Sequence, residues 1–80
     1  MTDLFNNTPK KELIKQFILS RNWTFTHEVC RWGVDHFYNR ALRSAQELCA
    51  EGFYRRMTEE EKARHLSPTR EDVWVKNDFR

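Results

Sequence analysis

The chain has 80 residues, of which 39% are hydrophobic, 32% charged and 14% aromatic, and this composition is that of one small globular domain rather than of a disordered chain. A net charge of +2 is too small to identify a nucleic-acid-binding protein by itself, and a domain of this size leaves little surface for a deep catalytic cleft. Because the sequence has neither a run of about 18 apolar residues nor a secretory leader, we expect a cytoplasmic protein without a membrane span.

The first predicted helix spans residues 9–21. Thr8 is its expected cap, and Pro9 is tolerated at the first helical position, where backbone N–H groups have no partner within the helix. Apolar residues then recur at helical spacing and predict one buried face, formed by Leu13, Ile14, Phe17 and Ile18. Residues 1–8 are expected to form an N-terminal tail.

Residues 23–25 are aromatic and β-branched and predict a short strand. A brief second helix is predicted to begin with Thr26 as its cap and to end at Gly33, because glycine is the usual residue just after a helix C-terminus. The side chains expected to face inward from this helix are those of Val29, Cys30 and Trp32.

The third predicted helix, at residues 36–51, has the clearest apolar periodicity in the chain. Asp35 is its expected cap, so only Gly33 and Val34 separate it from the second helix, which predicts a tight helix-turn-helix. Gly52 ends it. Its buried stripe is predicted to consist of Phe37, Ala41, Leu42, Ala45, Leu48 and Cys49.

The last part of the chain is predicted to hold an antiparallel pair of strands at residues 53–57 and 72–76. The connection between them contains Thr58-Glu59-Glu60-Glu61, which has the Thr-x-x-Glu pattern of a capping box, so we expect a helical turn there. Ser67-Pro68-Thr69 then reverses the chain, and residues 77–80 are expected to form a C-terminal tail.

Several stretches occur in an order that one known family uses. They are Trp23-Thr24-Phe25-Thr26-His27-Glu28-Val29, the turn Gly33-Val34, Arg40 through Leu48, Gly52-Phe53 and Glu71-Asp72-Val73-Trp74-Val75. In this order they resemble the small winged helix-turn-helix domains of bacteria and phages, over residues 9–76. The resemblance implies an α+β, mainly helical domain of three helices with a C-terminal two-stranded wing. Residues 58–70 depart from the family, because this segment is longer and more acidic than a simple wing.

In helix-turn-helix proteins the second helix of the motif enters the major groove, and its first residues reach the base edges. We therefore expect a non-catalytic transcription regulator of phage or prophage type that reads double-stranded DNA in the host cytoplasm with residues 36–51. Asparagine can pair with adenine and arginine with guanine. The expected base-reading residues are His36, Asn39, Arg40 and Arg43, with Ser44 beside them. The alternative interpretation of these residues is the solvated face of an amphipathic helix.

The positive charge is concentrated in the helical part of the chain. Residues 9–56 carry nine Lys and Arg against five Asp and Glu, a net +4, whereas residues 57–80 carry five against six, a net −1. The expected phosphate-contacting residues are Lys10, Lys11, Lys15, Arg55 and Arg56. A repressor would bind a pseudo-palindrome as a homodimer, for which Leu4, Phe5 and Phe79 are candidate contacts.

The sequence leaves two other classes of function open. The acidic residues 59–61 would repel phosphate, so the second hypothesis is an adaptor or inhibitor that binds a host or phage protein through the acidic wing and the termini. An enzyme is least supported, because the sequence has no Gly-rich phosphate loop and no catalytic triad order. We expect no metal or cofactor, since the spacing of His27, Cys30, Cys49 and His65 matches no closed zinc motif, and we expect both cysteines in the core.

Overall fold

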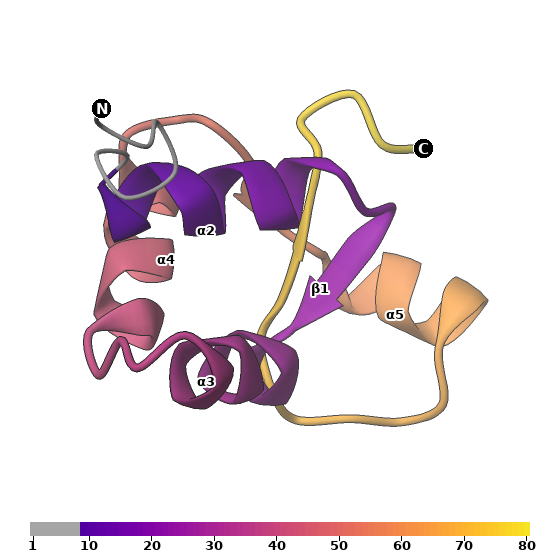
Figure 1. Ribbon diagram of the computed structural model, residues 1–80. Helices are drawn as coiled ribbons and strands as arrows, with labels where there is room; N and C mark the ends of the chain where they lie inside the picture. Colours follow the sequence, from indigo (N-terminus) through magenta and orange to yellow (C-terminus); the bar gives the residue numbers. More distant parts are fainter. Residues whose placement is uncertain (1–8) are drawn as a thin grey trace, which may run out of the picture.

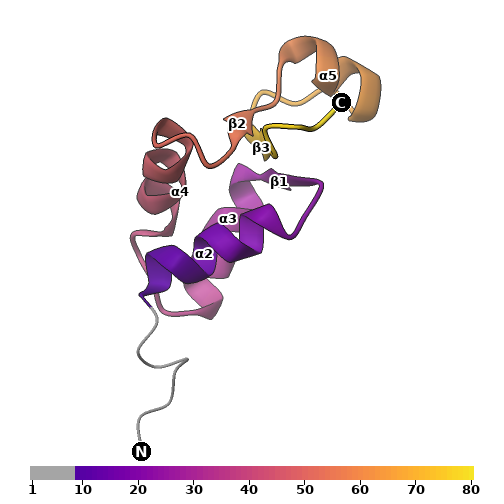
Figure 2. The same ribbon diagram turned by 90° about the horizontal axis from the view of Figure 1, so that it is seen from above.

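The computed structural model describes residues 9–80, and within this range the protein is an α+β domain, mainly helical, with four helices and a three-stranded antiparallel sheet (Figure 1). Three helices pack together beside the sheet and the fourth lies beyond its other end, as the view from above also shows (Figure 2). In chain order the elements are α2 (Lys10–Leu19), β1 (Trp23–Phe25), α3 (Thr26–Asp35), α4 (Ala41–Ala50), β2 (Arg55–Arg56), α5 (Glu59–His65) and β3 (Val73–Val75).

The sheet has the order β1-β3-β2, so the last strand of the chain is its centre. In the antiparallel register Val75 lies between Trp23 and Arg55, and Trp74 lies between Thr24 and Arg56. All three residues of β3 are buried, as a central strand covered on both faces requires. The predicted pairing of the two C-terminal strands is confirmed, although β2 and β3 are shorter than residues 53–57 and 72–76.

The first helix is confirmed, and it runs from Lys10 to Leu19 with Pro9 as its cap residue. Thr8, the expected cap, lies outside the described residues. Ile14 and Ile18 are buried, as the apolar spacing predicts. Their side chains join the main core, which also contains Val29, Trp32, Ala41, Ala45, Leu48, Tyr54 and Trp74.

The predicted end of the second helix at Gly33 is wrong, because α3 continues to Asp35. Gly33 is buried inside the helix, and a Cβ there would lie 2.7 Å from both the Ala41 Cβ and the carbonyl oxygen of Tyr38. Glycine is therefore required by the close contact of α3 with the start of α4. The helix ends at Asp35, and Phe37, which follows the C-cap residue His36, has a positive φ of 54°. Thr26 is the first helical residue rather than the cap.

The predicted start of the third helix at residue 36 is also wrong, because α4 begins at Ala41. Residues 36–40 form the turn between α3 and α4, so the turn is longer than the expected Gly33-Val34. Phe37 lies in this turn and is 94% exposed instead of buried. The rest of the predicted stripe faces the core, with Ala41, Ala45 and Leu48 buried and Leu42 and Cys49 packed against them.

Two expectations about individual side chains need correction. Cys30 points to solvent from α3 instead of into the core. Phe79 packs edge-on against Trp23, with ring centroids 6.0 Å apart, and against His65 at 5.3 Å, so it is a partly buried residue of the folded body rather than part of a separate tail. Leu4 and Phe5 lie outside the described residues.

Gly33→Ala is expected to lower the free energy of unfolding by about 1–3 kcal/mol, because the added methyl group meets backbone that cannot move away without separating α3 from α4. Urea unfolding measures this loss. Cys30→Ala, an exposed change on the same helix, is the control and should stay within about 0.5 kcal/mol of the wild type. Equal stabilities of the two variants would contradict the close contact.

Candidate nucleic-acid interface

The exposed side of α4 presents Arg43 and Gln46, which are neighbours on the helix surface because they are three residues apart. The opposite side is fixed by the buried Ser44, Ala45 and Leu48, so the direction of the exposed stripe follows from core packing. The Arg43 side chain is 72% exposed, and its Nε lies 3.8 Å from Glu47 Oε2. This loose pair leaves the guanidinium available to another partner.

A small hollow connects α4 with the edge of the sheet. It has a volume of about 220 Å³ and is lined by Gln46, Arg56, Asp72 and Trp74. Arg56 lies on β2, is exposed, and makes no ion pair within residues 9–80. The carboxylate of Asp72 is the acidic group beside it. Gln46 of α4 and Arg56 of β2 therefore line one hollow, together with the acidic Asp72.

The four predicted base-reading residues do not lie on one helix. Asn39 and Arg40 are exposed in the turn, Arg40 is the cap residue of α4, and Arg43 alone lies within α4. His36 is turned away from them: its ring stacks on Trp32 with centroids 4.0 Å apart, and its Nδ1 lies 2.8 Å from the carbonyl oxygen of Trp32. The structure thus brings three of the four to the beginning of α4 and leaves His36 out.

The three lysines of α2 are engaged within the protein. Lys11 pairs with Glu47 at 3.2 Å and Glu51 at 3.0 Å, and its hydrogen bonds to Glu51 and then Glu47 raise the pKa of the Lys11 ammonium. Lys15 pairs with Glu12 at 2.7 Å, while Lys10 donates a hydrogen bond to the carbonyl of the α3–α4 turn at residue 36. Lys11 therefore links α2 to α4, and its charge is largely balanced by the two carboxylates.

Arg55 is also engaged, although it neighbours Arg56. Its two terminal nitrogens donate to the two carboxylate oxygens of Glu61 at 2.8 and 2.9 Å, and one of them also donates to the carbonyl of Phe79 at 2.9 Å. The hydrogen bonds from Arg55, then that from the Thr58 backbone, lower the pKa of Glu61 to about 2, and the same pair raises the pKa of Arg55. Arg56 is thus the more accessible of the two arginines.

The acidic segment is a short helix with most of its charges paired. Thr58 and Glu61 form the predicted capping box, with Glu61 N donating to Thr58 Oγ1 at 3.1 Å and Thr58 N donating to Glu61 at 3.0 Å. Glu59 lies 3.4 Å from Lys62 Nζ and Glu60 lies 3.9 Å from Arg64. Of the three glutamates of α5, only Glu59 and Glu60 are exposed, so the acidic character of this segment is weaker than its sequence indicates.

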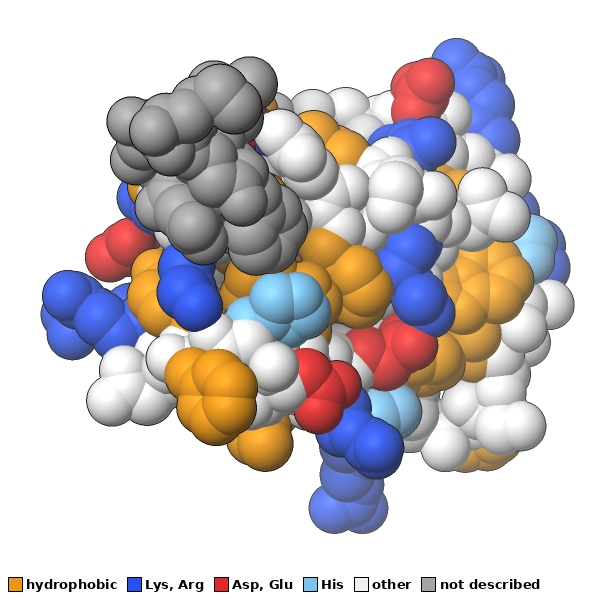
Figure 3. All heavy atoms as spheres, viewed as in Figure 1, with side chains coloured by type: hydrophobic (Ala, Val, Ile, Leu, Met, Phe, Trp, Pro, Cys, Tyr) orange, Lys and Arg blue, Asp and Glu red, His pale blue; other side chains and the backbone are white. Residues whose placement is uncertain are grey.

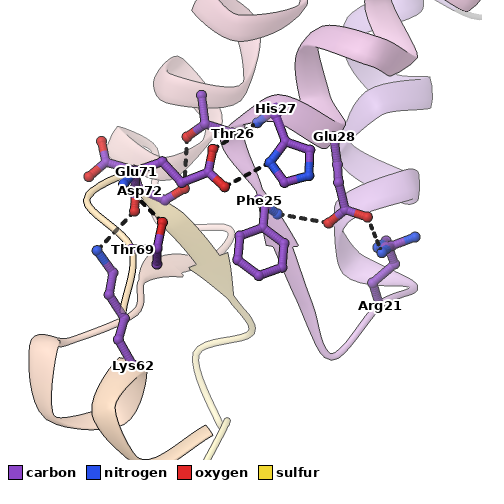
Figure 4. A network of polar contacts seen from close by, with 9 residues as sticks. All are labelled: Arg21, Phe25, Thr26, His27, Glu28, Lys62, Thr69, Glu71 and Asp72. Carbon is purple, nitrogen blue, oxygen red and sulfur yellow. Dashed lines mark hydrogen bonds and ion pairs between the residues drawn. The ribbon is translucent and has the colours of Figure 1, made fainter. Parts of the chain in front are cut away.

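A polar network ties the start of α3 to the chain that enters β3 (Figure 4). The hydroxyl of Thr26 donates to the carbonyl of Asp72 at 2.7 Å, and His27 Nδ1 lies 2.7 Å from Glu71 Oε1. Lys62 donates to the carbonyl of Glu71 at 2.9 Å, which extends the network to α5. These contacts hold the helices against the sheet. The contacts of Thr26 and His27 cannot be predicted from local sequence, because they join residues 46 and 44 positions apart.

The histidines and cysteines with the residue types of metal ligands do not lie together. His27 faces Glu71 and the ring of Phe25, while His65 packs against Trp23. In the part of the chain that the structure describes, no three His, Cys, Asp or Glu side chains are placed to hold a metal ion.

Comparisons with protein-family models, curated proteins and solved structures find no match to this chain. Among residues 9–80, no helix has both the length and the apolar character needed to cross a bilayer.

Proposed function

We propose that the protein is a winged helix-turn-helix domain that binds double-stranded DNA, with α4 in the major groove. The observation that carries the proposal is the hollow shared by Gln46 on α4 and Arg56 on β2. Arg43, whose guanidinium is only loosely paired, lies three residues before Gln46 on the same exposed side of α4. The order of the elements and the antiparallel pairing of the two C-terminal strands support the resemblance to the family.

The residue types at this surface suit both parts of DNA recognition. Arginine can donate two hydrogen bonds to guanine, and glutamine can pair with adenine, so Arg43 and Gln46 are proposed to read base edges. Asn39 and Arg40 precede them at the beginning of α4. Arg56 is proposed to contact phosphate and to fix the register on the duplex. The proposed activity is binding without catalysis, as in a transcription regulator of phage type in the host cytoplasm.

The proposal is tested by titrating the purified protein with a mixed-sequence duplex at two salt concentrations. Each phosphate contact should lower the affinity by roughly 3.5-fold between about 50 and 200 mM salt, so the size of the loss measures the number of contacts. We expect a dissociation constant in the micromolar range or below at the lower concentration. Absence of binding at about 50 mM salt would contradict the proposed function.

The second candidate function, an adaptor or inhibitor that binds a host or phage protein, is favoured by one observation. The side chains of Glu59 and Glu60 are 89% and 86% exposed at the end of the molecule remote from the α3–α4 turn, and could meet a basic protein surface (Figure 2). The same titration separates the two functions, because an adaptor of this kind gains nothing from the cations of α4 and β2.

A further inference from the structure

The most exposed large hydrophobic side chain among residues 9–80 is that of Phe37 in the α3–α4 turn. Its backbone has a φ of 54°, a left-handed conformation that a bulky residue rarely adopts. The N–H of Phe37 donates to the carbonyl of Val34 at 3.2 Å and the N–H of Tyr38 to that of Gly33 at 2.7 Å. These two bonds form a Schellman motif, in which the position of Phe37 is usually taken by glycine.

Both neighbours of Phe37 hold its ring outward. His36 is stacked on Trp32, and Tyr38 meets the edge of the same indole, with centroids 6.3 Å apart. The Tyr38 hydroxyl also lies 2.6 Å from Ser44 Oγ. The chain is anchored inward on each side of Phe37, and the Phe37 side chain itself is left exposed to solvent. A strained, exposed aromatic residue at a position that suits glycine indicates a function outside the folding of the monomer.

A hollow with mostly apolar lining lies beside this ring. It has a volume of about 530 Å³, and Phe37 is one of the residues that line it. Val34, 73% exposed, and the exposed Cys30 extend the same apolar surface along α3. Hydrophobic side chains are visible at the surface near α3 and the α3–α4 turn (Figure 3). The other residues that line the hollow are Gly33, Tyr38, Asn39, Ala41 and Leu42.

Opposite charges flank this apolar surface. Arg31 and Asp35 are exposed on α3, one turn apart, and Arg31 Nε lies 3.9 Å from Asp35 Oδ2, so their pairing is loose. If a second copy of α3 lies antiparallel to the first, Arg31 of each copy faces Asp35 of the other. The charges of this face are therefore complementary to those of the same face related by a two-fold axis.

We propose that two copies of this chain form a symmetric homodimer through this face. Phe37 of each copy enters the hollow of the other, and Arg31 pairs with the partner's Asp35 across the axis. A two-fold interface uses the same patch on both subunits, so the patch must be complementary to itself. A patch that holds both the Phe37 ring and the hollow meets this requirement. The proposal goes beyond DNA binding and does not depend on it. Arg43 and Gln46 lie on the exposed stripe of α4 and do not line the hollow, whereas Asn39, just before α4, does.

The first test is sedimentation equilibrium of the full 80-residue chain over a range of concentrations. We expect a reversible dimer with a dissociation constant on the order of 10–100 μM, as for a small interface. Phe37→Gly should weaken the dimer at least about tenfold, because it removes a central aromatic contact. The same substitution should raise the melting temperature of dilute protein by roughly 4–8 °C, because glycine relieves the left-handed strain. Loss of folding therefore cannot explain the loss of the dimer.

Phe53→Ala is the matched control, because Phe53 is a partly exposed phenylalanine that does not line the hollow. The dimer constant of this variant should stay within about twofold of the wild type, as for other changes outside an interface. A wild-type protein that is monomeric at all concentrations, or a Phe37→Gly variant that dimerises as tightly as the wild type, would overturn the proposal. The first outcome would direct attention to a different protein as the occupant of the hollow.

Charge reversal identifies the partner as a second copy. Arg31→Asp alone and Asp35→Arg alone place like charges opposite each other in a symmetric dimer and should each weaken it about tenfold. The variant that carries both changes restores opposite charges across the axis and should return to within about threefold of the wild type. A double variant no tighter than the single ones would overturn the two-fold arrangement.

Discussion

Glu61→Ala is expected to lower the free energy of unfolding by about 2–4 kcal/mol. The Glu61 carboxylate accepts two hydrogen bonds from Arg55 and one from the backbone of Thr58, so the substitution removes a two-bond ion pair and half of a capping box at once. It also leaves the guanidinium of Arg55, which is mostly shielded from solvent, without its charged partner. Urea unfolding followed by circular dichroism measures the loss.

The matched control is Glu60→Ala on the same helix. The Glu60 side chain is 86% exposed, and its contact with Arg64 is 3.9 Å long, so its removal should change the stability by less than about 0.5 kcal/mol. Equal losses in the two variants would show that only the net charge of α5 matters. A larger loss for Glu61→Ala would assign the effect to the pair with Arg55 and the cap.

The same residue makes the stability dependent on acid. Because Arg55 and then Thr58 lower the pKa of Glu61 from 4.5 to about 2 in the folded protein, the unfolded chain binds a proton at a higher pH than the folded one. The contribution of Glu61 is therefore fully present above pH 4.5 and is lost as the pH falls toward 2. Unfolding measured across this window should depend less steeply on pH in Glu61→Ala than in the wild type. Equal slopes would contradict the lowered pKa.

The elements that could be predicted from the sequence are those specified by adjacent residues. The apolar spacing of α2, the β-prone residues of β1 and the Thr-x-x-Glu pattern before α5 each act within one or two helical turns. Thr58 and Glu61 contact each other directly, so their pattern alone is sufficient to predict the capping box.

The turn between α3 and α4 could not be placed because two of its signals are ambiguous. A glycine at position 33 has the signature of a helix end, but glycine is needed there for another reason. In the folded chain Ala41 approaches so closely that a Cβ at position 33 would lie 2.7 Å from the Ala41 Cβ. Phe37 continues the apolar spacing of α4, yet it takes the left-handed position that ends α3. Spacing cannot distinguish a buried phenylalanine from an exposed one.

The residue types of the candidate interface were predictable from the sequence. Which of these side chains are free of ion pairs within the protein was not. Lys11 and Glu51 are 40 positions apart, and no local pattern shows that they pair. Gln46 was not among the base-reading residues predicted from the sequence. A signal for it existed, since Gln46 lies three residues after Arg43 on the polar side of a predicted helix.

Arg43→Ala is expected to weaken binding to a selected DNA site by about 1–3 kcal/mol, or roughly 5- to 150-fold, and to relax the preference at one base position. Arg56→Ala should weaken all sequences alike and reduce the salt dependence by about one phosphate contact. The site is first selected from random duplexes with the wild-type protein, and affinities are then measured by fluorescence anisotropy. Arg64→Ala is the control, because it removes the same charge from α5.

The comparison with Arg64→Ala separates base reading from simple attraction. If the positive charge of the domain alone held DNA, Arg43→Ala and Arg64→Ala would lower the affinity by the same factor, and that factor would shrink as salt screens the phosphates. If Arg43 lies in the groove, its loss should persist at higher salt on the selected site and fall to the level of Arg64→Ala on a scrambled duplex. Equal losses on both duplexes would contradict α4 as the reading element and leave the cations of β2 and the turn as a non-specific surface.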